Sequence, residues 1–333
     1  MPSGQTDGSA HPALIDDGPG RHLFLADVLD GLSRPQKRLW PKWFYDARGS
    51  EIFEAITEQP EYYPTRTERS ILEGQSGDIA GVIGPNAALI EPGSGSSIKS
   101  EVVLEAMIEP AAYVPMEISR DMLEEAVERL RGRFPGLPVH PVAADFMDDM
   151  AVPEIEEDVA CRVVFFPGST FGNMEKNERA ALLDRFHRLA AETPEGEMCP
   201  GGLLMGFDLH KDTATLEAAY NDAAGVTAEF NLNLLTRINS ELGGDFDLDG
   251  FEHRAVYDPI ERRIEMRLYA LEDQTVTVDE QSFEFEAGEH ILTEYSHKFT
   301  RESMAEELHE SRFEAEHVWT DEDDRFGLVF ARA

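Results

Sequence analysis

Residues 89 to 97 read L-I-E-P-G-S-G-S-S, an apolar strand followed by an acidic residue and a glycine-serine turn. The turn runs towards a predicted helix. At such a junction an open α/β sheet can bind a nucleotide-like cofactor, because glycine lets the backbone approach a ligand and the helix start offers free N–H groups. One turn is weak evidence, so its meaning depends on the segments around it.

Strand and helix patterns alternate through the middle of the chain. Strands are predicted at 87–91, 112–118, 139–143, 162–167 and 203–209, and helices at 97–107, 120–134 and 177–192. This alternation predicts an α/β fold with a mostly parallel, Rossmann-like sheet that is covered on both faces. Earlier helices are expected at 23–33 and at 67–80, the second with Thr67 as its N-cap.

The alternation ends after Leu209. Helices are predicted at 212–223 and 227–242, antiparallel strands at 252–257, 262–271, 275–278, 283–285 and 290–299, a helix at 301–311, and a hairpin from 313–319 and 326–331. We therefore expect an inserted α+β lobe of about 90 residues, the size of a small domain. The predicted division is a disordered lead (1–22), an aromatic and helical segment that joins the lobe (23–66), a cofactor-binding domain (67–209 and 300–333), and a substrate-binding lobe (210–299).

Composition excludes several classes of protein. The 333 residues include 66 acidic and 29 basic side chains, for a net charge of −37, which disfavours nucleic acids and anionic lipid as partners. Cys161 and Cys199 form no metal-binding or disulfide pattern, and D-F-D-L-D-G (245–250) lacks the glutamate that would complete a calcium loop, so we expect no metal. The N-terminus carries no secretion signal and no apolar run is long enough for a membrane span. A cytoplasmic monomer is predicted.

Small or acidic residues follow each of the first four predicted strands, where open α/β sheets bind ligands. Glu117 can accept hydrogen bonds from both ribose hydroxyls, Asp145 can take an adenine amine, and Phe146 can flank the adenine ring. Ile98 stands where a dinucleotide motif has its third glycine, so the pattern favours S-adenosylmethionine over NAD. The predicted cofactor residues are Gly93, Ser94, Gly95, Ser96, Lys99, Glu117, Asp145, Phe146, Gly168, Ser169 and Thr170.

The sequence resembles the histidine Nα-methyltransferases of ergothioneine biosynthesis, which make trimethylhistidine (hercynine) with S-adenosylmethionine. The resemblance runs from about residue 23 to the end. It is carried by P-K-W-F-Y-D-A-R-G-S (41–50), P-E-Y-Y-P-T-R-T-E (60–68), E-P-G-S-G-S-S (91–97), G-S-T-F-G-N (168–173), D-L-H-K-D (208–212), A-Y-N-D-A-A-G-V-T-A-E-F-N (219–231), D-F-D-L-D-G-F-E-H (245–253), R-I-E-M (263–266) and L-T-E-Y-S-H-K-F (292–299).

The resemblance implies a pocket for the amino-acid end of histidine. Tyr62, Asn173 and Tyr220 would hold the carboxylate and the amino group, with Gly168 serving both substrate and cofactor. Tyr45 would stand near the methyl-accepting nitrogen, so Tyr45 and Asn173 are the catalytic candidates. The substrates implied are L-histidine and its mono- and dimethyl forms, and S-adenosylhomocysteine is the implied by-product.

The resemblance also implies a site for the imidazole ring. Glu294 and Ser296 would bind its nitrogens, while Met266 and Phe53 pack around it. The cofactor side departs slightly from the family pattern, because Glu117 replaces the commoner aspartate and Pro92 replaces a larger residue.

Other interpretations remain open on the sequence alone. Glu294 and Ser296 can be the polar face of an exposed strand, Asn173 a helix cap, and Met266 an ordinary core residue. At the level of function, the alternatives are a methyltransferase of the same fold that acts on tryptophan or tyrosine, and a non-catalytic cofactor-binding module.

Overall fold

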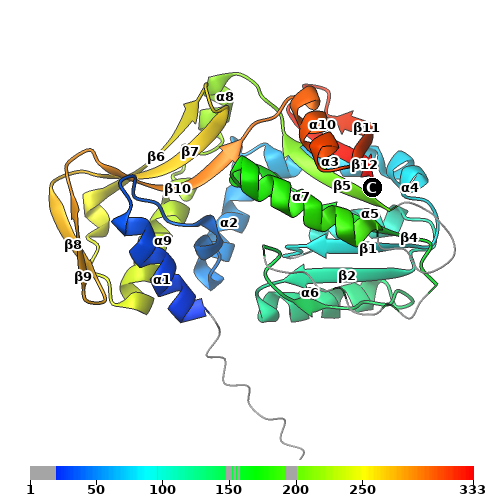
Figure 1. Ribbon diagram of the computed structural model, residues 1–333, viewed down its shortest axis with the longest axis horizontal. Coiled ribbons are helices and arrows are strands. Elements are labelled where there is room, and N and C mark those ends of the chain that lie inside the picture. The colour runs from blue at the N-terminus through cyan, green and yellow to red at the C-terminus, as the bar shows by residue number, and fades with distance from the viewer. Residues whose placement is uncertain (1–19, 96, 148–151, 153–154, 156–157, 192–200) are drawn as a thin grey trace, which may run out of the picture.

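The computed structural model describes residues 20–95, 97–147, 152, 155, 158–191 and 201–333. The predictions for Ser96, for Cys199 and for most of the disordered lead lie outside these residues. Two bodies stand side by side, one built around a large sheet and the other around a small one (Figure 1). No helix in the described part of the chain is long and apolar enough to span a membrane.

The large sheet has seven strands in the order β11-β12-β5-β4-β1-β2-β3. The five strands from β3 to β5 are parallel, whereas β12 runs antiparallel to β5 and pairs with β11 as a hairpin. Their bounds are β1 Ala87–Pro92, β2 Ala112–Glu117, β3 Val142–Ala143, β4 Cys161–Phe166, β5 Gly202–Asp208, β11 Glu314–Thr320 and β12 Phe326–Arg332. The mostly parallel Rossmann-like sheet and the terminal hairpin are therefore confirmed.

Helices pack on both faces of this sheet, as a mostly parallel sheet requires. One apolar core includes Leu182 and Phe186 of α7 and Met304 of α10, and the other includes Ile71 of α3 and Leu104 of α5. The bounds of the helices are α3 Pro64–Gly74, α4 Ser76–Ile83, α5 Ile98–Ala106, α6 Arg120–Arg133, α7 Lys176–Ala191 and α10 Arg301–Glu310.

The second body is an α+β unit with its own core. Its three-stranded sheet has the order β10-β7-β6, and β8 pairs with β9 beside it. The strands are β6 Phe251–Asp258, β7 Arg263–Ala270, β8 Gln274–Val278, β9 Gln281–Phe285 and β10 His290–His297, and the helices are α8 Thr213–Ala218, α9 Val226–Leu242 and the short η3 Leu248–Gly250.

The N-terminal segment packs into this second core. It consists of α1 Gly20–Ser33, the 3₁₀-helix η1 Pro41–Phe44 and α2 Ala47–Thr57. Phe24, Phe44 and Ile52 share one apolar cluster with Phe230 of α9 and Met266 of β7. Residues from the first fifth of the chain thus help to build the unit that contains β10.

Three local predictions were wrong. The helix expected at 67–80 is two helices that meet at Gln75, and Thr67 lies inside α3 instead of capping it, because Pro64 is accepted in the first turn of a helix. Residues 20–22 belong to α1, not to a disordered lead. The strand expected at 139–143 is reduced to β3, because Pro141 cannot donate a hydrogen bond to the ladder.

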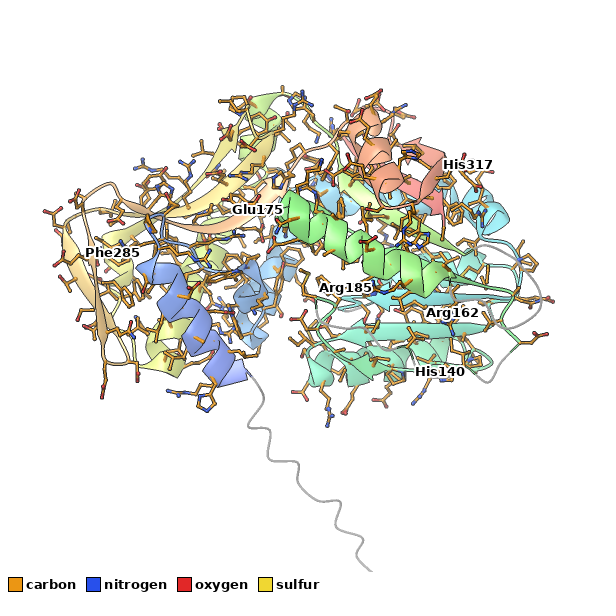
Figure 2. The ribbon with its side chains drawn as sticks, viewed as in Figure 1. His140, Arg162, Glu175, Arg185, Phe285 and His317 are labelled. Atoms are coloured by element: carbon orange, nitrogen blue, oxygen red, sulfur yellow. The ribbon has the colours of Figure 1, made fainter. Side chains whose placement is uncertain are left out.

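The two bodies are tied together where the chain crosses between them. The backbone N–H of Phe299 donates to the carbonyl of Asp208 (2.9 Å), and that of His210 donates to the carbonyl of Phe299 (2.8 Å). Glu175, just before α7, lies where the bodies meet (Figure 2) and pairs with Arg263 of β7 at 3.6 Å. This junction places the end of β10 beside the carboxyl end of β5.

Candidate active site

The glycine-serine turn after β1 is held against β2. The N–H groups of Gly93 and Ser94 donate to the carbonyl of Met116 at 2.8 and 3.0 Å. Gly93 has φ +70°, and a Cβ there would lie 3.2 Å from the Phe146 ring. The Ser94 hydroxyl is buried without a hydrogen-bond partner. An unmade hydrogen bond at a buried turn is costly unless a ligand completes it.

Two acidic residues of the predicted cofactor site fold back onto the backbone. Glu117 accepts hydrogen bonds from the N–H groups of Gly95 (3.0 Å) and Ser119 (3.1 Å). Asp145 accepts one from the N–H of Met147 (2.8 Å). Both carboxylates therefore lie at the same edge of the sheet as the glycine turn, with free oxygen lone pairs for further donors.

Glu91, the acidic residue before the turn, has a structural role and does not face the proposed cofactor site. Its side chain is 1% exposed and accepts hydrogen bonds from the hydroxyls of Ser100 and Tyr113. Burial raises the pKa of Glu91 to about 7. It joins the start of α5 to the first two strands beneath the turn.

Glu68 of α3 organises the loop after β4 and was not among the predicted site residues. Its fully buried carboxylate accepts the N–H of Gly168 (2.7 Å) and forms an ion pair with Lys99. Lys99 and Gly168, both predicted to face the cofactor, are therefore held together by one side chain. The sequence signal was available, because Glu68 closes the P-E-Y-Y-P-T-R-T-E motif.

The loop after β4 continues into the 3₁₀-helix η2 Thr170–Asn173, which packs directly on β10. A Cβ at Gly172 would lie 2.8 Å from the carbonyl oxygen of His297, so only glycine permits this approach. His297 Nδ1 donates to the Gly172 carbonyl at 2.8 Å, and burial lowers the pKa of His297 to about 4. Ser169, at the start of this turn, has a buried hydroxyl with no partner.

Asn173 and Glu294 meet as a result. Asn173 Nδ2 donates to Glu294 Oε2 at 3.3 Å. Glu294 is 8% exposed and Ser296 1% exposed, so the interpretation as an exposed polar strand is wrong. Burial raises the pKa of Glu294 to about 8, against the lowering effect of the Lys298 ammonium.

A β-bulge sets the direction of these side chains. The β10–β7 register shifts between Leu292 and Glu294, after which Glu294 lies opposite Met266. Thr293, the extra residue, donates its hydroxyl to the Met266 carbonyl at 3.0 Å. Bulges of this kind redirect side chains next to functional sites. Met266 is 2% exposed and belongs to the apolar core.

Aromatic rings form a wall beside β10, where the Tyr220 hydroxyl lies 2.7 Å from Ser296 Oγ. Tyr45 packs edge-on against Phe53 (5.6 Å between ring centroids), Phe53 against Tyr62 (6.3 Å), and Tyr62 against Tyr220 (6.2 Å). Phe230 of α9, which was not predicted, packs against Tyr45 and Phe53. The four predicted aromatic residues therefore come together from two distant stretches of the chain, residues 45–62 and the turn after α8.

Tyr45 combines accessibility with a low-dielectric surrounding. It is 45% exposed, yet desolvation by the surrounding protein and the nearby Glu294 carboxyl raise its pKa well above the usual value.

A buried charge network links the two sheets beneath this wall. Asp208, at the end of β5, accepts hydrogen bonds from Tyr63 (2.8 and 2.7 Å), Lys211 (2.7 Å) and Lys298 (2.7 Å). The two lysines lower the pKa of Asp208 despite its burial. None of these three charged residues was predicted, although all lie within quoted motifs.

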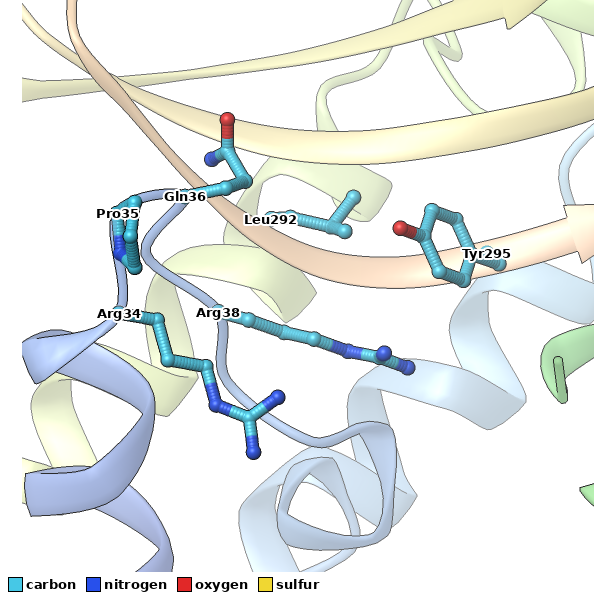
Figure 3. A pocket seen from close by; sticks show the side chains of 6 residues that line it. All are labelled: Arg34, Pro35, Gln36, Arg38, Leu292 and Tyr295. Carbon is cyan, nitrogen blue, oxygen red and sulfur yellow. The ribbon is translucent and has the colours of Figure 1, made fainter.

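A pocket lies on the opposite face of β10. Leu292 and Tyr295 line it with Arg34, Gln36 and Arg38 (Figure 3), together with Pro35. The side chain of Tyr295 points away from the residues on either side of it, as alternation along a strand requires. This pocket is therefore separate from the cluster around Glu294 and Ser296.

The described residues fit an adenosyl cofactor. Ser94 and Ser169 present buried hydroxyls that lack partners, Glu117 stands beside the turn, and the Phe146 ring lies against Gly93. These groups lie at the carboxyl ends of β1, β2, β3 and β4, where open α/β sheets bind nucleotides.

Comparisons with known proteins agree with this geometry. The profile of the family described as histidine-specific methyltransferase, SAM-dependent, matches residues 24–333. The histidine N-alpha-methyltransferase of Mycolicibacterium smegmatis is 42% identical over 92% of this chain and 93% of its own, and that of Mycobacterium tuberculosis is 40% identical over 93% and 95%. Ergothioneine biosynthesis protein 1 of Neurospora crassa is 30% identical over 65% of this chain and 26% of its own.

The match of the family profile covers both bodies of the structure, from α1 to the last strand, and the two mycobacterial relatives align over nearly their whole lengths. The chain therefore belongs to the family of SAM-dependent, histidine-specific methyltransferases.

Proposed function

We propose that this enzyme transfers methyl groups from S-adenosylmethionine to the α-amino nitrogen of L-histidine, three times, to form trimethylhistidine (hercynine) for ergothioneine biosynthesis. The observation that carries the proposal is the contact between Asn173 and Glu294. It joins Asn173, at the end of the loop after β4 that we propose to bind the cofactor, to a buried carboxyl that can accept a hydrogen bond from an imidazole N–H.

The cofactor-side roles follow from the strand ends. Bound S-adenosylmethionine supplies an electrophilic methyl group on a positively charged sulfur. We propose that Glu117 receives the ribose hydroxyls, that Asp145 and Phe146 bind adenine, and that Ser94 and Ser169 complete their unmade hydrogen bonds on the cofactor. Gly93, Gly95, Ser96, Lys99, Gly168 and Thr170 complete this proposed site.

The roles of the residues proposed to bind histidine follow from the aromatic wall and from β10. Glu294 and Ser296 are proposed to bind the ring, with Met266 and Phe53 packing against it. Tyr62, Asn173 and Tyr220 would hold the carboxylate and amino group. Anchoring both ends of the substrate leaves the amino nitrogen free to turn between successive transfers, and fixes its approach to the methyl carbon.

The amine must lose its proton before it can attack. A neighbouring positive sulfur favours the neutral amine, because like charges disfavour the protonated form. The raised pKa of Tyr45 keeps its phenol protonated, so Tyr45 is not a phenolate base. We propose that in the first two transfers its oxygen accepts an N–H of the amine and orients the lone pair towards the methyl group. The neutral dimethyl amine of the third transfer has no N–H to donate.

Three methylations end in a permanent cation, and the aromatic wall suits it. Quaternary ammonium groups are stabilised by the faces of aromatic rings. Tyr45, Phe53 and Tyr62 lie within one cluster of edge-to-face ring contacts near the proposed amine position. This supports a product with a bulky charged nitrogen.

The domain division is proposed on the same basis. The sheet of β1 to β5 with β11 and β12 would bind the cofactor, and the unit of β6 to β10 with residues 23–66 would bind histidine. Action in the cytoplasm as a monomer stays a prediction.

Mass spectrometry of the products from histidine and S-adenosylmethionine tests the proposal. We expect masses increased by one, two and three methyl groups, with the trimethyl form accumulating. A panel of amino acids in the same assay tests the alternative substrates: preferred methylation of tryptophan or tyrosine would refute the histidine assignment.

Glu294→Ala should weaken histidine binding while S-adenosylhomocysteine binding stays near that of the wild type.

A further inference from the structure

Lys298 is a fully buried cation, and none of the proposed substrate contacts involves it. It lies two residues after Ser296, so the two side chains leave β10 and its extension on the same side. Its ammonium group donates to Asp208 Oδ2 (2.7 Å), Ser296 Oγ (2.7 Å) and Tyr220 Oη (3.2 Å). A lysine has three donors and no acceptor, so these contacts use its whole hydrogen-bonding capacity.

These contacts restrict the protons of Ser296 and Tyr220. Both oxygens accept from Lys298, and they lie 2.7 Å apart, so one hydroxyl must donate to the other. The two hydroxyls carry two protons, and their mutual hydrogen bond uses one. The pair therefore offers a single proton to a bound substrate.

The chemistry of the two hydroxyls decides which proton remains. A phenol is the stronger donor and the weaker acceptor of the two, so Tyr220 donates to Ser296. The shorter distance from Lys298 to Ser296 than to Tyr220 agrees with this direction. Ser296 Oγ then accepts twice, which fills its two lone pairs, and its own proton points to the substrate.

We infer that Lys298 is a positioning residue that makes Ser296 a hydrogen-bond donor and so selects histidine with a neutral imidazole ring. This inference rests on the proposed function, in which Glu294 accepts the single ring N–H. The other ring nitrogen of a neutral imidazole is then an acceptor for Ser296. An imidazolium has a proton at that position and meets a second donor.

Lys211 offers a matched control. It also pairs with Asp208 (2.7 Å) and is largely buried, but its other contacts are Tyr63 (2.6 Å) and the Leu209 carbonyl, not Ser296 or Tyr220. If Lys298 served only to neutralise Asp208, Lys298→Met and Lys211→Met would affect histidine binding alike. We expect Lys298→Met to raise the Kd for histidine about tenfold or more, and Lys211→Met to raise it less than about threefold.

A double-mutant cycle with Ser296→Ala gives the sharper test. Calorimetry with S-adenosylhomocysteine present would measure the histidine Kd of wild type, Lys298→Met, Ser296→Ala and the double variant. If Lys298 acts through Ser296, its replacement should change the Kd less than about threefold in the Ser296→Ala background. If the Kd of the double variant equals the product of the two separate fold-changes, Lys298 and Ser296 act independently and the inference is overturned.

The pH dependence supplies a second readout when it is compared with the Ser296→Ala background, where it should vanish. This comparison is needed because Lys298 also lowers the pKa of Glu294, an effect that would be present in both backgrounds. The ratio of the variant Kd to the wild-type Kd should be largest above pH 7 and shrink below about pH 6.5, where the free imidazole gains a proton. A ratio that does not change with pH contradicts the inference. If Lys298→Met does not fold, the double variant Asp208→Asn/Lys298→Met takes its place in each measurement. The single variant Asp208→Asn then serves as the reference in place of the wild type. Wild-type protein that fails to bind histidine would refute the proposed function itself, whereas unchanged affinity in the variant refutes only the role of Lys298.

Discussion

Asn173 and Glu294 are separated by 121 positions in the sequence, yet Asn173 Nδ2 donates to Glu294 Oε2 at 3.3 Å. Gly172 makes the contact possible, because it lets η2 approach the backbone of His297. The loop after β4, proposed to bind the cofactor, and the proposed imidazole site are therefore coupled through the backbone of two short segments. A change at this crossing should alter histidine binding more than cofactor binding.

Gly172→Ala tests that coupling. The added Cβ would lie 2.8 Å from the His297 carbonyl oxygen and 3.2 Å from its nitrogen, so η2 must move away from β10. We expect the histidine Kd to rise about tenfold or more, because small displacements of binding groups are costly. Calorimetry measures it. Gly81→Ala, in α4 with open space around its Cβ position, is the control and should leave the Kd unchanged. Equal effects from both variants would contradict the coupling.

Glu294→Gln tests the protonation of the buried carboxyl. In the ligand-free protein the pKa of Glu294 is raised to about 8 by burial, whereas an exposed glutamate titrates near 4.5. The unfolded chain thus releases this proton first, and the wild type loses stability as the pH rises from about 4.5 to about 8. Glutamine does not titrate. The free energy of unfolding of the variant minus that of the wild type, measured by chemical denaturation, should grow across this window and level off on either side, with a total on the order of a few kcal/mol. A difference that is constant with pH would show that Glu294 is ionised when the site is free.

Glu68→Gln tests the support of the cofactor loop. The substitution weakens the ion pair with Lys99 and the hydrogen bond from Gly168. We expect weaker binding of S-adenosylhomocysteine and a stability loss of about 1–3 kcal/mol, because both partners are left poorly paired. Glu73→Gln, which alters an exposed pair with Arg69 on the same helix, should change stability by less than about 0.5 kcal/mol. Chemical denaturation and calorimetry would distinguish the two.

Ser94→Ala tests whether a ligand completes the glycine turn. The Ser94 hydroxyl is buried without a partner, so its removal should leave the stability of the ligand-free protein unchanged or raise it. Binding of S-adenosylhomocysteine should weaken by about 1 kcal/mol, the usual contribution of one hydrogen bond. Ser100→Ala removes a hydroxyl that does have a partner, Glu91, and should lower stability instead. Loss of stability in Ser94→Ala would show that its hydroxyl has a structural role.

The sequence allowed the parallel sheet, its helices and the inserted unit to be predicted because their patterns are local. Apolar runs with βα spacing identify β1, β2, β4 and β5 whatever the rest of the chain does. The break at Gln75 was missed although Gly74 precedes it and Gly77 follows it, because isolated glycines are tolerated within a helical pattern. The bulge at Thr293 was equally hidden, because it depends on how β10 pairs with β7.

The buried network required the tertiary structure. Asp208 and Lys211 lie at the end of β5, while Lys298 follows β10, and each resembles an ordinary surface charge in the sequence. Only the crossing of the chain at Leu209 and Phe299 brings them together. Sequence patterns identify residues at strand ends well, but they do not show which charged residues lose their contact with water.

The hydrogen-bonded crossing at Asp208, His210 and Phe299 has an evolutionary consequence. Because the chain leaves and rejoins the large sheet at adjacent points, a segment of different length can be accommodated there without altering the large sheet. Exchange of that segment as a cassette offers a route to new acceptor molecules. The cassette would not be sufficient alone, since Phe24, Phe44 and Ile52 belong to the same core and would have to be exchanged with it.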